Sequence, residues 1–142
     1  MSWIITLALV SLGSSVTFAA LDEKDFGSAL QQVYKSFHDK CNLVVGINQK
    51  DIDEMKNGTF PNDERVQRYV LCLYVFSGVL STDLSVNIDL FDYYAPGKIN
   101  EQTYIDCFEE TKKSDIHEPA HLMVWKATQC IYNKDPENFL MY

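Results

Sequence analysis

The chain has 142 residues, a length suited to a single domain with one hydrophobic core, and a formal net charge of −8. All of that charge lies beyond residue 20, and the basic residues form no cluster larger than Lys112-Lys113. An acidic surface without basic clusters argues against nucleic acids and anionic membranes as partners.

The first 19 residues predict a secretory signal peptide. Residues 4–10 are apolar apart from Thr6, and Thr17 and Ala19 place small side chains at the −3 and −1 positions of a cleavage site after Ala19. A membrane helix is the alternative, but the apolar run is short and is interrupted by Ser11 and Gly13. We therefore expect a secreted, extracellular protein without membrane insertion, whose mature domain covers residues 20–142.

Helical patterns account for the first part of this mature domain. Residues 22–41 carry an apolar stripe at the three- and four-residue spacing of an amphipathic helix. We expect residues 42–47 to form a connector. Asn48 can then cap a short helix that stops at Asn57-Gly58.

Residues 66–77 are expected to form the central helix of the domain. Asn62 or Asp63 supplies an N-cap before it, and Gly78 can stop it. One face is apolar at helical spacing, and the neighbouring faces are largely apolar too, so other helices should cover it on most sides.

Two further helices and one short one follow from the second half. Residues 88–94 predict a short helix that is stopped by Pro96-Gly97. Asn100 can cap the next helix, and Pro119, a residue favoured at the first helical position, should begin the last long one. No stretch alternates with period two for long enough to be a strand. The sequence therefore predicts an all-α domain of about six helices.

The cysteines are even in number and all lie in the mature domain, at Cys41, Cys72, Cys107 and Cys130. In a secreted chain they indicate two disulfides, for which three connectivities are possible and spacing alone does not choose. Asn57-Gly58-Thr59 is a glycosylation sequon, which marks where a glycan could be attached.

One motif of metalloenzymes occurs, His117-Glu118-Pro119-Ala120-His121, which matches H-E-x-x-H. Zinc proteases need both histidines one turn apart within a continuous helix. Pro119 breaks such a helix, so we interpret the motif as a helix boundary. We expect no enzyme, no cofactor and no metal site.

With the helices and cysteines laid out, residues 22–142 resemble the insect odorant-binding proteins of the pheromone-binding and general odorant-binding family. The four cysteines match the first, third, fourth and sixth of the six that this family carries. Arg68 and His121 stand where the second and fifth would be. Loss of that one bonded pair is the pattern of the four-cysteine Minus-C branch. We expect Arg68 and His121 to face each other and either to reach solvent or to share a hydrogen bond.

The resemblance implies the disulfide pairs Cys41–Cys72 and Cys107–Cys130, and helices arranged around an internal apolar cavity. It implies a carrier that binds small hydrophobic ligands, such as odorants or pheromones, and transports them through an aqueous fluid without any reaction. The implied partner is a small apolar ligand, and an olfactory receptor is a further candidate. The alternative is a secreted salivary, venom or gland protein on the same scaffold that acts by protein–protein contact.

Candidate ligand-binding residues are taken from the inward faces of the helices and from the apolar tail. A tail of apolar residues is unusual for an exposed terminus, so we expect residues 139–142 to fold back as part of the cavity wall. Any one of the candidates can instead be ordinary core. The full set is Phe37, Tyr69, Leu73, Phe76, Leu90, Tyr104, Phe108, Leu122, Trp125, Phe139 and Tyr142.

Overall fold

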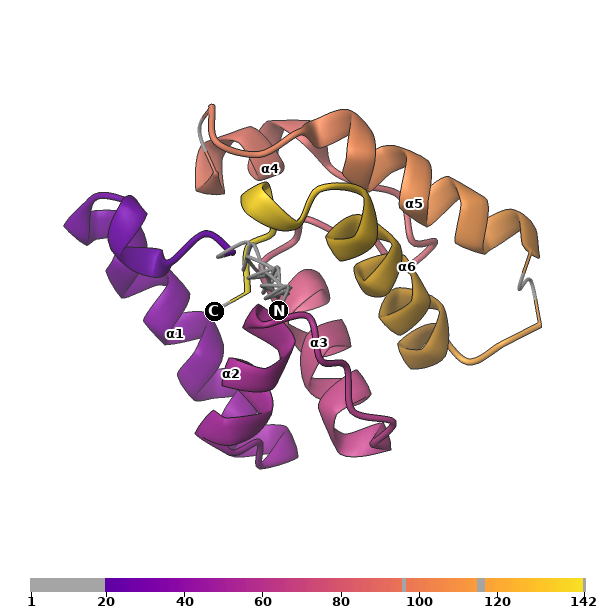
Figure 1. The fold of residues 1–142 in the computed structure, drawn as a ribbon, viewed down its shortest axis with the longest axis horizontal. Helices are drawn as coiled ribbons and strands as arrows, with labels where there is room; N and C mark the ends of the chain where they lie inside the picture. The colour runs from indigo at the N-terminus through magenta and orange to yellow at the C-terminus, as the bar shows by residue number, and fades with distance from the viewer. Residues whose placement is uncertain (1–19, 96, 115–116, 142) are drawn as a thin grey trace, which may run out of the picture.

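The computed structural model describes residues 20–95, 97–114 and 117–141. Within these ranges the chain forms six α-helices and two short 3₁₀ helices, and no strand beyond two isolated bridges (Figure 1). In chain order they are η1 (Glu23–Asp25), α1 (Ser28–Val45), α2 (Gln49–Lys56), α3 (Glu64–Phe76), α4 (Ile88–Tyr94), α5 (Glu101–Ser114), α6 (Ala120–Lys134) and η2 (Pro136–Asn138). The prediction of an all-α domain with about six helices is confirmed. The predicted signal peptide lies outside the described residues.

Helices α3 and α6 together form the centre of the packing, whereas the sequence predicted α3 alone. Helix α3 packs against α1 on one side and against α6 on another, and α5 packs against α6 in turn (Figure 1). Val66, Tyr69 and Val70 of α3 have no exposed surface at all. Removing these apolar side chains from water is the main stabilising contribution of the arrangement.

Side-chain caps begin α2, α3 and α5 where the sequence predicts. The Asn48 side chain accepts a hydrogen bond from the amide of Asp51 at the start of α2. Asp63, rather than Asn62, caps α3 by accepting from the amide of Arg65. Each cap satisfies an amide that the first helical turn leaves without a partner.

The predicted bounds of the first helix are wrong at both ends. Residues 22–41 are not one helix: η1 comes first, Gly27 separates it, and α1 starts at Ser28. The expected connector at 42–47 is mostly helix, because α1 continues to Val45 and ends only at Gly46, which has φ 76° and donates its amide to the Asn42 carbonyl. The helix runs past its buried stripe, so apolar spacing underestimated its length.

The last helix begins one residue later than predicted. Pro119 is the N-cap of α6, with φ −58° and ψ 143°, and Ala120 is its first helical residue. An extended ψ is usual for an N-cap residue. Proline also disfavours the helical conformation in the residue before it, so the helix cannot start earlier.

Both disulfides implied by the resemblance are present. Cys41 of α1 is bonded to Cys72 of α3, and Cys107 of α5 to Cys130 of α6, each with a Cα–Cα distance of 5.7 Å. A disulfide that closes a loop of this size lowers the entropy of the unfolded chain and so stabilises the fold by about 3–4 kcal/mol. Each bond therefore fastens one outer helix to a helix of the α3–α6 pair.

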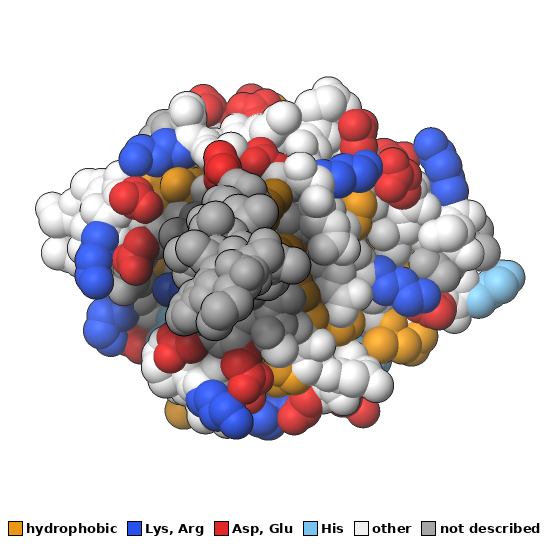
Figure 2. Space-filling view, viewed as in Figure 1, with side chains coloured by type: hydrophobic (Ala, Val, Ile, Leu, Met, Phe, Trp, Pro, Cys, Tyr) orange, Lys and Arg blue, Asp and Glu red, His pale blue; other side chains and the backbone are white. Residues whose placement is uncertain are grey.

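The acidic side chains of the described residues are spread over the surface and are not gathered in one patch. Figure 2 shows acidic side chains spread around the visible face and interspersed with lysines and arginines. No helix of the described residues is long and apolar enough to cross a bilayer.

Candidate ligand-binding site

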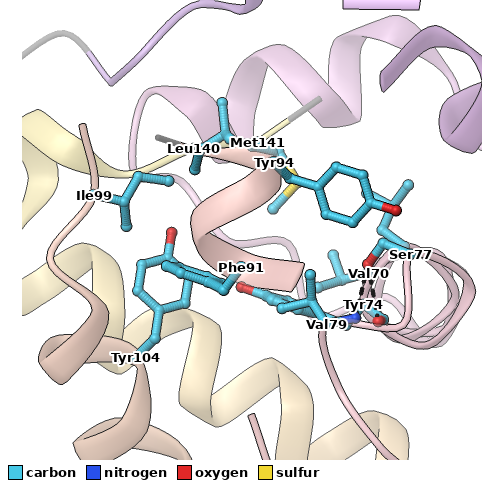
Figure 3. A pocket seen from close by; sticks show the side chains of 12 residues that line it. Val70, Tyr74, Ser77, Val79, Phe91, Tyr94, Ile99, Tyr104, Leu140 and Met141 are labelled. Carbon is cyan, nitrogen blue, oxygen red and sulfur yellow. Dashed lines mark hydrogen bonds between the residues drawn. The ribbon is translucent and has the colours of Figure 1, made fainter. Parts of the chain in front are cut away.

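An apolar pocket lies between the end of α3, helix α4, the first turn of α5 and the chain's tail (Figure 3). None of the residues that line it is charged. Its cavity volume is about 40 Å³. The lining residues are Val70, Leu73, Tyr74, Ser77, Val79, Phe91, Tyr94, Ala95, Ile99, Tyr104, Leu140 and Met141.

The walls come from elements that local sequence places well. Asn87 caps α4 by accepting from the amide of Leu90, which fixes the start of this seven-residue helix. Phe91 of α4 then meets Tyr104 of α5 edge to face, with ring centroids 4.5 Å apart. Tyr94, one turn further along α4, lies on the other side of the pocket near Ser77 (Figure 3).

The tail forms the remaining wall. Phe139 is fully buried, and Met141 is only 3% exposed. The amide of Leu21 donates to the Phe139 carbonyl at 2.9 Å, and Leu21 forms an isolated parallel bridge with Leu140. Figure 1 shows the tail returning from the end of α6 toward α1. The backbone at Leu21 thus holds the tail in place beside the pocket.

Most polar atoms of the pocket are already satisfied. The Ser77 hydroxyl donates to the Tyr74 carbonyl at 3.0 Å. Burial raises the pKa of Tyr74, whose hydroxyl is hydrogen-bonded to Thr128. The Tyr94 carbonyl accepts a hydrogen bond from the Tyr34 hydroxyl. The Tyr94 hydroxyl itself has no partner among the described residues, which leaves it available to a ligand.

Of the residues suggested by the sequence, Leu73 and Tyr104 line this pocket. Two others, Phe37 and Phe108, lie directly behind its wall, and Phe76 packs against Phe37. The Phe37 ring packs against Tyr94 at 5.4 Å and against Phe76 at 5.8 Å, and the Phe108 ring packs against Tyr74 at 5.4 Å. Phe76 is nevertheless 46% exposed on its other side.

The remaining candidates lie elsewhere. Trp125 and Phe139 both pack against Phe60, in a closed group of rings. The Tyr69 hydroxyl is 2.8 Å from Nδ1 of His38, between α1 and α3. Leu90 and Leu122 are half-buried in α4 and α6, and Tyr142 lies outside the described residues. For all eleven candidates, a role in binding stays a prediction.

The sequence reading did not select several residues that the pocket uses. It chose Leu90 from α4, whereas Phe91 and Tyr94 are the residues that face the pocket. A helix of two turns is too short for periodicity to identify its inner face. Ala95 and Ile99 belong to the connection after α4, where no periodic signal exists.

Arg68 and His121 are the two residues that the resemblance places at the positions of the absent cysteine pair. Arg68 is exposed and forms an ion pair with Glu64 of its own helix, with Nη2 and Oε1 2.6 Å apart. His121 is half-buried in the first turn of α6. That the two side chains face each other stays a prediction.

The H-E-x-x-H motif does not have the geometry of a zinc site. His117 is exposed and precedes α6, whereas His121 lies inside it. Among the described residues, no three side chains of the metal-binding types are grouped so that they could hold an ion.

Comparison with known proteins agrees with this geometry. Residues 23–134 match the PBP/GOBP family. The chain belongs to this family. Its members are non-enzymatic carriers, and the four cysteines in two disulfides are consistent with the Minus-C type. No match was found among curated proteins.

Solved structures show the same fold at low identity. Apis mellifera odorant binding protein 5 superposes with a TM-score of 0.60 and 16% identity, over 87% of this chain and 99% of that one. Odorant binding protein 4 of Chrysopa pallens gives a TM-score of 0.57 and 14% identity, over 82% of this chain and 99% of that one. The PBP/GOBP fold is therefore retained where most residues differ.

Proposed function

We propose that this PBP/GOBP protein is a secreted carrier that encloses one small, mainly apolar molecule in the pocket under its tail. The observation that carries the proposal is the uncharged pocket closed by Leu140 and Met141. Such a site can bind by burial but has no group placed for acid–base or nucleophilic chemistry.

The pocket must widen to accept a ligand. Its volume of about 40 Å³ holds only a few water molecules at about 10–15 Å³ each, whereas a cavity of about 150 Å³ is needed for benzene. Met141 is the side chain best suited to move, because methionine is unbranched and adapts its shape readily. Hiding about 300 Å² of apolar ligand surface contributes about 7 kcal/mol, from which the costs of association are subtracted, so burial of apolar surface is the main source of affinity.

Tyr94 supports a finer statement about the ligand. Its hydroxyl has no partner among the described residues, and it lies at the edge of a pocket without charged residues. A ligand with one oxygen function, such as an alcohol, aldehyde, ketone or ester, would gain a hydrogen bond there worth about 1 kcal/mol. We expect such compounds to bind more tightly than hydrocarbons of equal size.

Displacement of a fluorescent naphthylamine probe tests the proposal. Apolar volatiles and fatty compounds should displace the probe from the mature protein. Tyr94→Phe should lower the affinity for alcohols several-fold and leave the affinity for hydrocarbons unchanged. Tyr93→Phe, which alters an exposed neighbour outside the pocket, is the matched control. A protein that binds neither probe nor any apolar compound would contradict the carrier function. An equal loss for alcohols and hydrocarbons would contradict the role of Tyr94.

Exposed apolar residues at the end of α1 support a second candidate function, in which the protein acts by protein–protein contact. Leu43 and Val44 are 88% and 80% exposed, and Val44 lines a surface groove with Leu71 and Val75 of α3. Exposed aliphatic side chains of this kind mark contact surfaces more often than carrier cavities. The double variant Leu43→Asp with Val44→Asp should leave probe binding unchanged. If this variant loses biological activity while Tyr94→Phe keeps it, the result would favour a function by protein–protein contact.

A further inference from the structure

We propose that Asn57 carries an N-linked glycan in the mature protein. Asn57-Gly58-Thr59 is the only N-x-S/T triplet in the whole sequence. It lies at the turn between α2 and α3, where Asn57 is the C-cap of α2. Both Asn57 and Thr59 are exposed. The two residues that a glycosyltransferase reads are therefore at the surface.

The first two residues of the triplet have structural roles of their own. The Asn57 side-chain amide donates to the Asp53 carbonyl at 2.9 Å and so helps to end α2. Gly58 has φ 78°, and a Cβ at this position would overlap the ring of Tyr132. Helix ending and close packing therefore explain Asn57 and Gly58 without any modification.

Thr59 is different, because nothing in the fold requires its side chain. Its amide donates to the Glu54 carbonyl at 2.8 Å, which any residue except proline could do. Its hydroxyl has no hydrogen-bond partner in the described part of the chain. The hydroxyl is the one feature of the triplet that the fold leaves unused, and it is the feature that defines a sequon.

The local geometry accommodates the modification. The Asn57 amide nitrogen bonds to the anomeric carbon of an N-acetylglucosamine as that carbon's bond to a lipid-linked pyrophosphate breaks. The pyrophosphate leaves with the bonding electrons, and the nitrogen loses one proton. The nitrogen keeps its second hydrogen, so the bond to the Asp53 carbonyl can persist. A sugar on an exposed side chain points into solvent.

The glycan would stand apart from the ligand pocket. No residue of the turn between α2 and α3 lines that pocket. Phe60, which follows the triplet, is half-buried and packs against Trp125 at 5.4 Å, away from that pocket's lining. The glycan should therefore leave ligand affinity unchanged.

The test is to express the complete chain, with its own leader, in insect cells and to measure the intact mass of the product. We expect a mass higher than that of the polypeptide by one N-linked oligosaccharide. Peptide-N-glycosidase should remove the difference and convert Asn57 to Asp. Probe binding should be the same before and after this treatment.

Two threonine variants separate glycosylation from folding. Thr59→Ala keeps the Asn57 cap and the Gly58 contact but should abolish the added mass, whereas Thr59→Ser should retain it. Thr82→Ala changes an exposed threonine outside any sequon and serves as the control. A wild-type product at the unmodified polypeptide mass, in cells or in medium, would overturn the proposal. An added mass that survives Thr59→Ala would overturn it equally, because the sugar would then sit elsewhere.

Discussion

Two aromatic regions of the interior meet at the tail, and only one of them is fully packed. The closed cluster consists of Phe60, Trp125, Tyr132 and Phe139, whose rings meet edge to face at centroid distances of 5.3–6.1 Å. The apolar pocket proposed to bind ligand begins one residue further along the tail, at Leu140. Its rings border a cavity of about 40 Å³ instead of filling it.

The difference follows from which elements supply the side chains. Trp125 and Tyr132 of the closed cluster are held on the long helix α6, and edge-to-face rings interlock in a favoured geometry. The pocket is bordered by the short helix α4, by its following connection and by the flexible side chain of Met141. Rigid elements thus anchor the tail at Phe139, and adaptable ones surround the space that a ligand would use.

Truncation of Phe139 should produce the largest effect. Phe139→Ala removes a fully buried ring from the closed cluster and should lower the free energy of unfolding by about 3–5 kcal/mol. It should also raise the ligand off-rate, since the tail loses its anchor. Urea unfolding and stopped-flow probe release measure the two effects. A loss below about 1 kcal/mol would show that the cluster does not hold the tail.

Substitution of Gly58 should have the second largest effect on the free energy of unfolding, because a Cβ at this position disturbs the same cluster. Gly58→Ala strains a residue with positive φ and pushes a Cβ into the ring of Tyr132, which together should cost about 2–4 kcal/mol. Gly46→Ala is the matched control, since Gly46 has φ 76° but open space around it, so only the conformational cost of about 1–2 kcal/mol applies. Equal losses for the two variants would mean that Tyr132 moves aside freely.

Truncation of Met141 tests whether the pocket, unlike the closed cluster, has unfilled space that a ligand can use. Met141→Ala should cost about 2 kcal/mol, at the low end for a buried methionine, because the site already contains unfilled space. The enlarged pocket should bind bulkier ligands more tightly while small ligands lose affinity. Probe displacement with a series of alcohols of increasing length measures this shift. A uniform loss across the series would place Met141 in the core alone.

The contribution of Tyr34 to the pH dependence of stability should be the smallest effect near neutrality and should appear in alkali. Burial raises the pKa of Tyr34, which donates to the Tyr94 carbonyl behind the pocket, to about 12. In the unfolded chain this hydroxyl ionises near pH 10. The stabilisation is therefore complete below about pH 10 and is lost as the pH rises toward 12.

Thermal unfolding between pH 8 and 12 tests this prediction. Wild-type stability should decline across that window, and Tyr34→Phe should make the decline shallower. The decline should not disappear, because burial also raises the pKa of Tyr69 and of Tyr74. An identical slope in Tyr34→Phe and wild type would show that ionisation of Tyr34 is not linked to unfolding.

The sequence by itself determined the helices and most of their starts. Asn48 and Asp63 act within one turn of their own position, so a cap can be predicted without knowledge of the rest of the fold. The resemblance then supplied both disulfide pairings, because the cysteines keep their order along the chain. The error at the end of α1 arose where local pattern and burial diverge: Leu43 and Val44 continue the helix although both side chains are exposed.

Only the tertiary structure decided which apolar residues border space and which fill it. Leu73, Phe108 and Trp125 look alike in a periodic pattern, yet one lines the pocket, one lies behind its wall and one belongs to the closed cluster. Periodicity reports that a residue points inward, whereas a cavity depends on how side chains from α3, α4, α5 and the tail meet. That meeting joins residues far apart in sequence, such as Leu21 and Leu140, and no local signal contains it.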